Sequence, residues 1–166
     1  MRLAHSICAS LLLAATLTGC AASPRTNTTP DDFSFGIVVP SALRDADLAP
    51  GWIVVDPDGG VREFAGEVTR DTRLPRRATT LSRDKLDALH QQLADASILN
   101  YGAVGEPVGD ASAVFNRTGM VGVWWSANGR RRSMLLSPAL SEDAAALAVI
   151  AQAYRDVRTQ TWEPTP

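Results

Sequence analysis

The sequence contains few of the residues from which most reactive sites are built. It has two cysteines, Cys8 and Cys20, and two histidines, His5 and His90. A metal site needs several such ligands together, and a serine or cysteine nucleophile needs a base beside it. No serine has a G-x-S-x-G setting, and no glycine-rich loop has the lysine that phosphate cradling requires. We therefore expect no metal, no cofactor and no enzymatic activity.

Lysine is almost absent as well. Lys85 is the single lysine, so nearly all the positive charge is arginine. The whole chain has a net charge of −2, and without residues 1–19, which contain Arg2, 15 basic side chains face 18 acidic ones, a net charge of −3. A mildly acidic chain argues against nucleic acid as the main partner.

No apolar run is long enough to cross a membrane, which takes about 20 residues. The longest candidate, ICASLLLAATLTG at 7–19, follows Arg2 and His5 and ends in small residues. A basic start, a short apolar centre and small residues at the end are typical of a secretory signal. We predict that residues 1–19 are a cleaved signal peptide.

Cys20 stands at the end of this segment. Cys8 would be removed with the signal, so the mature chain has no second cysteine for an internal disulfide. A lone cysteine also lacks the companions of a metal site. Of the three roles open to Cys20, the one that remains is an attachment point.

Leu17-Thr18-Gly19-Cys20 resembles the lipobox of bacterial lipoproteins, in which an aliphatic residue, a small residue and Gly or Ala precede the cysteine. The resemblance implies that Cys20 becomes the lipid-bearing first residue of the mature protein. Several acyl chains on one residue anchor a protein stably, whereas one chain binds marginally. By the sorting rule of that class, Ala21 implies the inner leaflet of the outer membrane, facing the periplasm.

The rest of the chain divides by composition. Residues 20–32 carry Pro24, Pro30 and small polar residues without apolar periodicity, which predicts a flexible tether spanning on the order of 20 Å. Residues 33–162 have the size of one domain, and 163–166 form a C-terminal tail.

The first pattern inside the domain is GWIVVDPDGGVREF, at 51–64. Two β-branched and aromatic runs flank a turn sequence, which indicates a hairpin with a two-residue loop at Asp58-Gly59 or Gly59-Gly60. Either loop puts Ile53 and Val55 on one face with Phe64. The other face would carry Trp52, Val54, Val61 and Glu63. We interpret Asp56 and Asp58 as turn residues, since a calcium loop needs Gly where Val61 stands.

An amphipathic helix is predicted next, over 82–96. Ser82 is the expected N-cap, and Leu86, Leu89 and Leu93 recur at helical spacing.

A second hairpin follows, over 119–136. Its Asn128-Gly129 turn pairs Trp125 with Arg132 and Trp124 with Ser133. The face of Trp125 should be core, with Val121, Val123, Met134 and Leu136, and the opposite face carries Gly122, Trp124, Ser126, Arg131, Ser133 and Leu135.

A second helix is expected over about 141–157. Ser141 is its expected N-cap, and Leu147, Ile150, Ala151, Tyr154 and Val157 form one stripe. The order ββαββα predicts an α+β domain with an antiparallel sheet from two β-hairpins and both helices packed on one face. In this order the body resembles small secreted or lipid-anchored bacterial domains of unknown function, a resemblance of pattern that transfers no active-site residue.

Trp124 is the leading candidate for partner binding. If the helices cover the Trp125 face, Trp124 lies uncovered beside Leu135 and near Arg131, a composition typical of binding hot spots. Burial of Trp124 under the 33–40 segment or a loop is the equal alternative. Arg130 and Arg132 crowd the same turn, and Arg70, Arg73, Arg76 and Arg77 form a second basic cluster. Lipid phosphates or an acidic protein could use these clusters, but charged residues that keep a sheet edge soluble, with Arg132 packed over Trp125, explain them more simply.

Other candidates are weaker. His90 flanks the buried stripe of the first helix and is expected to be a partly packed surface histidine. Loop carboxylates could converge in an active site, and Asp45, Asp47, Glu106 and Asp110 are the ones to test. Solvated surface acids are the simpler explanation.

The sequence thus predicts a lipid-anchored, periplasm-facing protein that acts as a protein-binding or scaffold module of the cell envelope. An inhibitor or immunity-type protein against a periplasmic enzyme is the alternative, and a hydrolase using loop carboxylates comes last. The expected partners are the membrane, through the lipid on Cys20, and an envelope protein.

Overall fold

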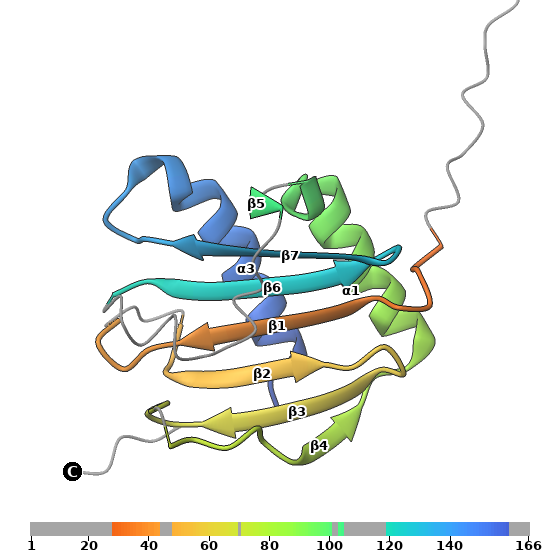
Figure 1. The fold of residues 1–166 in the computed structure, drawn as a ribbon, viewed down its shortest axis with the longest axis horizontal. Helices are drawn as coiled ribbons and strands as arrows, with labels where there is room; N and C mark the ends of the chain where they lie inside the picture. The colour runs from red at the N-terminus through yellow and green to blue at the C-terminus, as the bar shows by residue number, and fades with distance from the viewer. Residues whose placement is uncertain (1–27, 44–47, 70, 101–102, 105–118, 160–166) are drawn as a thin grey trace, which may run out of the picture.

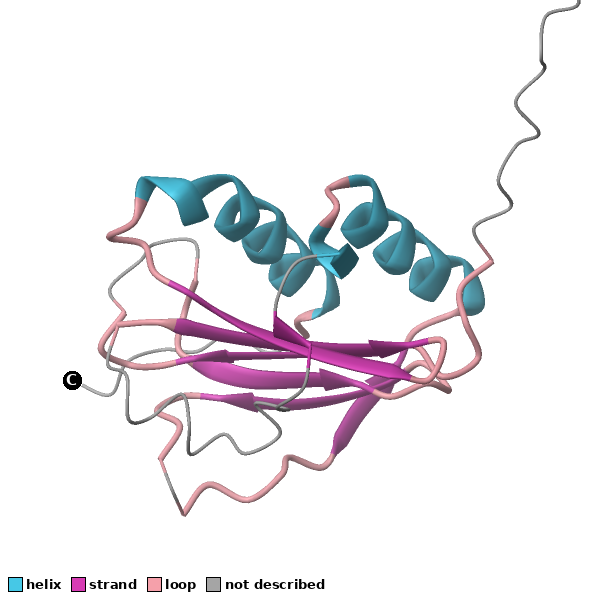
Figure 2. Cartoon of the chain, turned by 45° about the horizontal axis from the view of Figure 1, so that its top comes forward, coloured by secondary structure: helices cyan, strands magenta, loops and turns pink. Residues whose placement is uncertain are grey.

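A computed structural model describes residues 28–43, 48–69, 71–100, 103–104 and 119–159. These residues form a twisted antiparallel sheet with helices on one side (Figures 1 and 2). Cys20, the lipobox and most of the tether lie outside them, as do Arg70 and the four loop carboxylates. The strands are β1 Ser34–Val39, β2 Gly51–Val55, β3 Gly60–Ala65, β4 Arg77–Thr80, β5 Ala103–Val104, β6 Val121–Ala127 and β7 Arg130–Leu136. The helices are α1 Arg83–Asp95 and α3 Ala144–Val157, with short 3₁₀ turns η1 Ile98–Asn100 and η2 Ser141–Asp143.

The sheet order is β4-β3-β2-β1-β6-β7-β5, and every neighbouring pair is antiparallel. The predicted α+β class is confirmed, and Figure 2 shows both helices on the same side of the sheet. The predicted ββαββα order and two-hairpin layout are wrong. Strands β1 and β4 extend the first hairpin on both sides, α1 follows β4, and β5 adds a short edge strand beside β7.

β1 is the centre of the sheet, whereas the sequence indicates 33–40 only as a possible cover for Trp124. It pairs with β2 on one side and β6 on the other. Phe35, Ile37 and Val39 point toward the helices and Val38 points away from them, yet all four side chains are fully buried. A strand that is buried on both faces reads as a continuous apolar run, without the alternation that marks a half-exposed strand.

The facing predicted for the first hairpin is wrong, because its loop has three residues. Val55 pairs with Val61, and the backbone N–H of Asp56 bonds the carbonyl of Gly60 at 2.7 Å, leaving 57–59 as the loop. Gly59 has a φ of +79°, as expected for the left-handed residue of such loops. The extra residue changes the pairing by one position, which moves side chains of one strand to the other face. The helix side therefore carries Ile53, Val55, Val61 and Glu63, and the opposite side carries Trp52, Val54, Arg62 and Phe64.

The register predicted for the second hairpin is confirmed. Trp125 pairs with Arg132 and Trp124 with Ser133, and the five residues expected in the core are all buried. Asn128 and Gly129 both have positive φ, at 54° and 70°, as a two-residue turn of this kind requires. Asp32 holds the turn from outside, since its carboxylate accepts bonds from the backbone N–H groups of Asn128, at 2.7 Å, and Gly129, at 2.5 Å.

Helix α1 begins and ends as predicted. The hydroxyl of Ser82 accepts a bond from the backbone N–H of Lys85 at 3.4 Å, and the helix ends with Ala96 as its C-cap. Leu86, Leu89 and Leu93 are buried against the sheet.

The predicted N-cap of the second helix is wrong. Ser141 begins the 3₁₀ turn η2, and α3 starts three residues later with Asp143 at its N-cap position. The Asp143 carboxylate accepts a bond from the backbone N–H of Ser137 at 2.7 Å, so it ties the helix start to the end of β7. The predicted stripe does face the core: Ile150, Ala151, Tyr154 and Val157 are buried, and Leu147 is half-buried.

Candidate functional site

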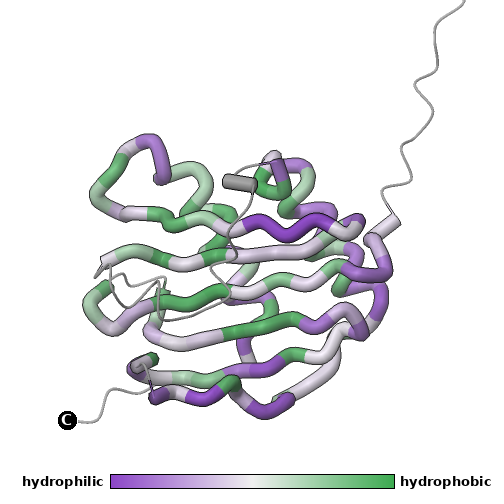
Figure 3. The backbone as a smooth tube through the Cα atoms, viewed as in Figure 1, coloured by the Kyte–Doolittle hydropathy of each residue, from purple (hydrophilic) through white to green (hydrophobic). Residues whose placement is uncertain are grey.

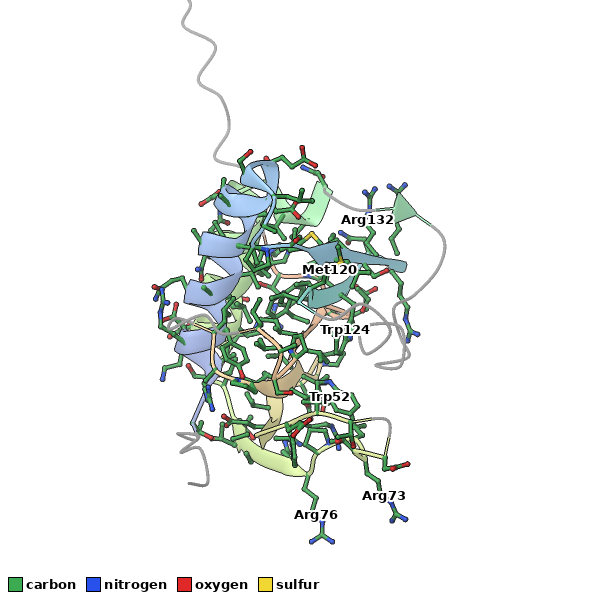
Figure 4. The ribbon with its side chains drawn as sticks, turned by 90° about the vertical axis from the view of Figure 1, so that its left-hand side faces the viewer. Trp52, Arg73, Arg76, Met120, Trp124 and Arg132 are labelled. Carbon is green, nitrogen blue, oxygen red and sulfur yellow. The ribbon has the colours of Figure 1, made fainter. Side chains whose placement is uncertain are left out.

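The side of the sheet away from the helices has its own apolar cluster, which we call the helix-free face. Val38 of β1 and Val68, from the segment after β3, are its buried members. Four half-buried side chains pack around them: Trp52, Phe64, Trp124 and Leu135. They come from β2, β3, β6 and β7, so the cluster reaches across the sheet. Figure 4 shows Trp52 and Trp124 together on this side.

Trp124 is positioned by a glycine. Gly36 of β1 is its partner across the strands, and a Cβ at position 36 would overlap the indole ring of Trp124. The ring thus lies over Gly36, which leaves Trp124 half-buried. The 33–40 segment does not cover Trp124 from above, because it is the neighbouring strand of the same sheet. Trp124 therefore lies on the helix-free side, as predicted, with one part packed and another part open.

Trp52 is the second tryptophan of this face, but the sequence predicts Val61 and Glu63, rather than Phe64, as the β3 residues on its side. It pairs with Val38 on one side and Phe64 on the other. Its indole N–H is buried and has no hydrogen-bond partner among the described residues. An unpaired buried donor costs stability. The three-residue loop after β2, one residue longer than predicted, is what places Phe64 beside Trp52.

Arginines stand around the helix-free face. Arg131 of β7 is exposed on the same side as Leu135, and Arg73 and Arg76 are exposed in the segment between β3 and β4. Figure 4 shows Arg73 and Arg76 projecting outward beyond Trp52. Leu74, between them, is 54% exposed. In the part of the chain that the structure describes, Arg73, Arg76 and Arg131 form no ion pair.

Two other arginines of this region have acidic partners. Arg77 contacts Asp58 at 2.8 Å, and Arg62 contacts Asp56 at 2.8 Å. The backbone N–H of Gly60 also bonds Asp58 at 3.0 Å, and this bond, together with Arg77, lowers the pKa of Asp58. Asp56 is therefore bonded within its own hairpin, and Asp58 is bonded by its hairpin and by the adjoining strand β4, in agreement with their interpretation as turn residues.

The five residues predicted to bind a partner do not form one surface. Trp124, Arg131 and Leu135 share the helix-free face. Arg130 and Arg132 point to the helix side, because neighbouring residues of a strand face opposite ways. Arg132 donates a bond to the carbonyl of Asn100 at 3.0 Å, and it pairs with Trp125 across the strands. The sequence grouped these arginines by position, and the pleat of β7 separates them.

His90 is more deeply placed than expected. It is only 7% exposed, and its ring meets Phe33 edge to face, with 4.9 Å between the ring centres. Burial lowers the pKa of His90; Asp87 acts to raise it, and Arg83 acts to lower it. The described residues include no group of three or more His, Cys, Asp or Glu side chains that could hold a metal ion.

Comparison with known proteins does not assign the chain to a family. No protein-family model matches the chain, and no curated protein matches it. Neither α1 nor α3, the helices in the described part of the chain, is long and apolar enough to cross a membrane.

Proposed function

We propose that this protein is a lipid-anchored module of the bacterial cell envelope, which binds an acidic protein partner through its helix-free face. The observation that carries the proposal is the grouping of Trp52, Trp124 and Leu135 beside exposed arginines on that face. Half-buried tryptophans next to arginine form the residue set most common in binding hot spots. Figure 3 shows how apolar and polar positions are distributed along the strands.

The exposed arginines of the helix-free face favour an acidic partner. Arg73, Arg76 and Arg131 have no ion pair among the described residues, although the mature chain is acidic overall. Guanidinium groups pair with carboxylates through two parallel hydrogen bonds, which adds geometric specificity to the contact. An acidic protein surface with an apolar centre complements this arrangement. In the cell, the lipid on Cys20 would hold the face in the periplasm.

The test is photo-crosslinking in growing cells with the native N-terminus kept. A crosslinking amino acid replaces Trp124, Arg131 or Arg130 in three separate strains. Positions 124 and 131 should each give one discrete adduct with the same protein, which mass spectrometry identifies. Position 130 is the matched control, since it lies on the neighbouring position of β7 and faces the helix side. Adducts of equal yield from 130, or none from 124 and 131, would overturn the proposal.

Affinity then tests the charge argument. With the captured partner purified, Arg131→Glu should weaken binding about tenfold, equal to about 1.4 kcal/mol. Arg130→Glu should leave it unchanged. A complex present during normal growth supports a scaffold role, whereas a captured lytic or toxic enzyme that the protein silences would assign an inhibitory role to the same face.

A further inference from the structure

A groove lies on the helix side of the sheet, between α1, η1 and the β6–β7 hairpin. Its volume is about 530 Å³. Pockets for small organic ligands have volumes of about 300–1,000 Å³. The residues that line the groove and could recognise a ligand are His90, Asn100, Trp125, Asn128, Arg130 and Arg132.

Two arginines line this groove. Arg130 and Arg132 are two residues apart on β7, so both point to the same side of the sheet. One N–H of Arg132 bonds the carbonyl of Asn100 at 3.0 Å, which fixes the side chain and leaves its other donors available. Neither arginine forms an ion pair with any described residue.

The carboxylates on neighbouring elements already have partners. Asp32 binds the backbone N–H groups of the Asn128-Gly129 turn. Asp87 of α1 contacts Arg83 at 3.0 Å, and Asp95 accepts a bond from Gln91 at 2.5 Å. None of these three carboxylates forms an ion pair with Arg130 or Arg132 in the described structure.

His90 adds a buried polar atom without a partner. The residue is 7% exposed, and its Nδ1 is buried and makes no hydrogen bond to any described residue. Buried polar atoms are nearly always hydrogen-bonded, and His90, whose Nδ1 has no such bond among the described residues, also lines the groove. The apolar side chains of Ala94 and Leu99 also line the groove and offer contact to the rest of such a ligand.

We propose that this groove binds a small molecule that carries an oxyanion, a carboxylate or a phosphate. The oxyanion lies between the guanidinium groups of Arg130 and Arg132, whose planar donor arrays match either anion. This site is separate from the proposed protein interface, because the sheet lies between the two. Loss of one therefore leaves the other intact.

The test is an NMR titration of the full chain with inorganic phosphate and, separately, with succinate. The imidazole signal of His90 is the reporter, and it is assigned by its loss in His90→Gln, since His5 is the only other histidine. The pH and the ionic strength are held constant with sodium chloride. We expect a saturable shift with at least one anion, and the anion that saturates identifies the oxyanion.

Three variants complete the test. Arg130→Gln and Arg132→Gln should each weaken binding about tenfold, as loss of a charge-assisted hydrogen bond predicts. Arg131→Gln, between them on the opposite face, should keep the affinity within about twofold. A linear, non-saturating response to both anions would overturn the proposal, and so would an Arg131→Gln effect equal to that of Arg130→Gln. Crosslinking at position 124 is the independent measure of the protein interface.

Discussion

Gly36 has no side chain, and the indole of Trp124 fills the space above it. We predict that Gly36→Ala destabilises the domain by about 1–3 kcal/mol, the usual cost of overpacking, because the new methyl group displaces the ring. Urea unfolding measures the loss. In a Trp124→Ala background the same change should cost much less, since the ring is gone. An equal cost in both backgrounds would mean that the ring does not lie over Gly36.

Tyr154 ties α3 to the segment before β2. Its hydroxyl donates a bond to the carbonyl of Ala49 at 3.0 Å, and burial raises the pKa of Tyr154 to about 12, with Glu63 adding to the rise and Arg158 opposing it. The unfolded chain loses this proton near pH 10, whereas the folded protein keeps it. The stabilisation from Tyr154 should therefore be fully present below pH 10. Between pH 10 and 12, the free energy of unfolding should fall by up to about 1.4 kcal/mol per pH unit.

The measurement is urea unfolding at several pH values from 8 to 12. Tyr154→Phe should lose about 1 kcal/mol at neutral pH with the hydrogen bond, and its alkaline slope should be shallower than that of the natural protein. Identical slopes in the two proteins would assign the alkaline loss to other groups.

At the scale of elements, Glu63 fastens the end of α3 to β3. Its side chain is 1% exposed, accepts two bonds from Thr159, at 2.9 and 2.6 Å, and contacts Arg158 at 3.5 Å. Glu63→Ala leaves the charge of Arg158 without this carboxylate in a site where Arg158 is only 13% exposed. We expect a loss of about 3 kcal/mol in the free energy of unfolding, as for breaking a buried ion pair.

Asp156, an acidic residue of α3 itself, provides the control. Asp156 is exposed and bonds only Gln152 in the described structure, at 2.7 Å. Asp156→Ala should change stability by no more than about 0.5 kcal/mol. If chemical denaturation gives similar losses in the free energy of unfolding for the two variants, Glu63 does not hold the end of α3 against β3.

The elements also show how far sequence reasoning reaches. The Asn128-Gly129 turn allows one register, so every pair of the β6–β7 hairpin was predictable, and so was the helix-free placement of Trp124. The turn before Gly60 allows several loop lengths, and one extra residue moved Phe64 to the face of Trp52. Strand β1 is buried on both faces and lacks alternation, while β4 is a short, polar edge strand. The apolar run of β1 does not by itself distinguish a strand from another buried segment, and the polar β4 carries no local signal of its own.

The candidate site was only half predictable for the same reason. Trp124, Arg131 and Leu135 share a face that follows from local alternation. The groove of His90 depends on where α1 packs across the sheet, which sequence spacing does not reveal. Val68 joins the helix-free face from a loop without any periodicity, so no pattern could have placed it.

At the scale of the whole molecule, the proposed lipid anchor on Cys20 can be tested directly. We predict that Cys20→Ser removes the lipid, so that the protein leaves the membrane fraction and loses the acyl mass, since membrane binding scales with buried acyl chain. Cell fractionation and intact-mass spectrometry measure both effects. A Cys8→Ser variant is the matched control, because Cys8 lies in the predicted signal and should leave the mature mass unchanged. An unaltered mass and unaltered membrane association in Cys20→Ser would refute lipid anchoring.

The central place of β1 has a consequence for the order of folding. Its pairing with β6 joins Ser34 to Ser126, 92 positions apart, whereas each hairpin closes over a few residues. Contacts distant in sequence pay a larger loop-closure entropy and slow the folding rate. In stopped-flow experiments, substitutions in the β6–β7 hairpin should change the folding rate, whereas Gly36→Ala should mainly speed unfolding. The β1–β6 seam then closes after the two hairpins, so the centre of the finished sheet is one of its later contacts to form.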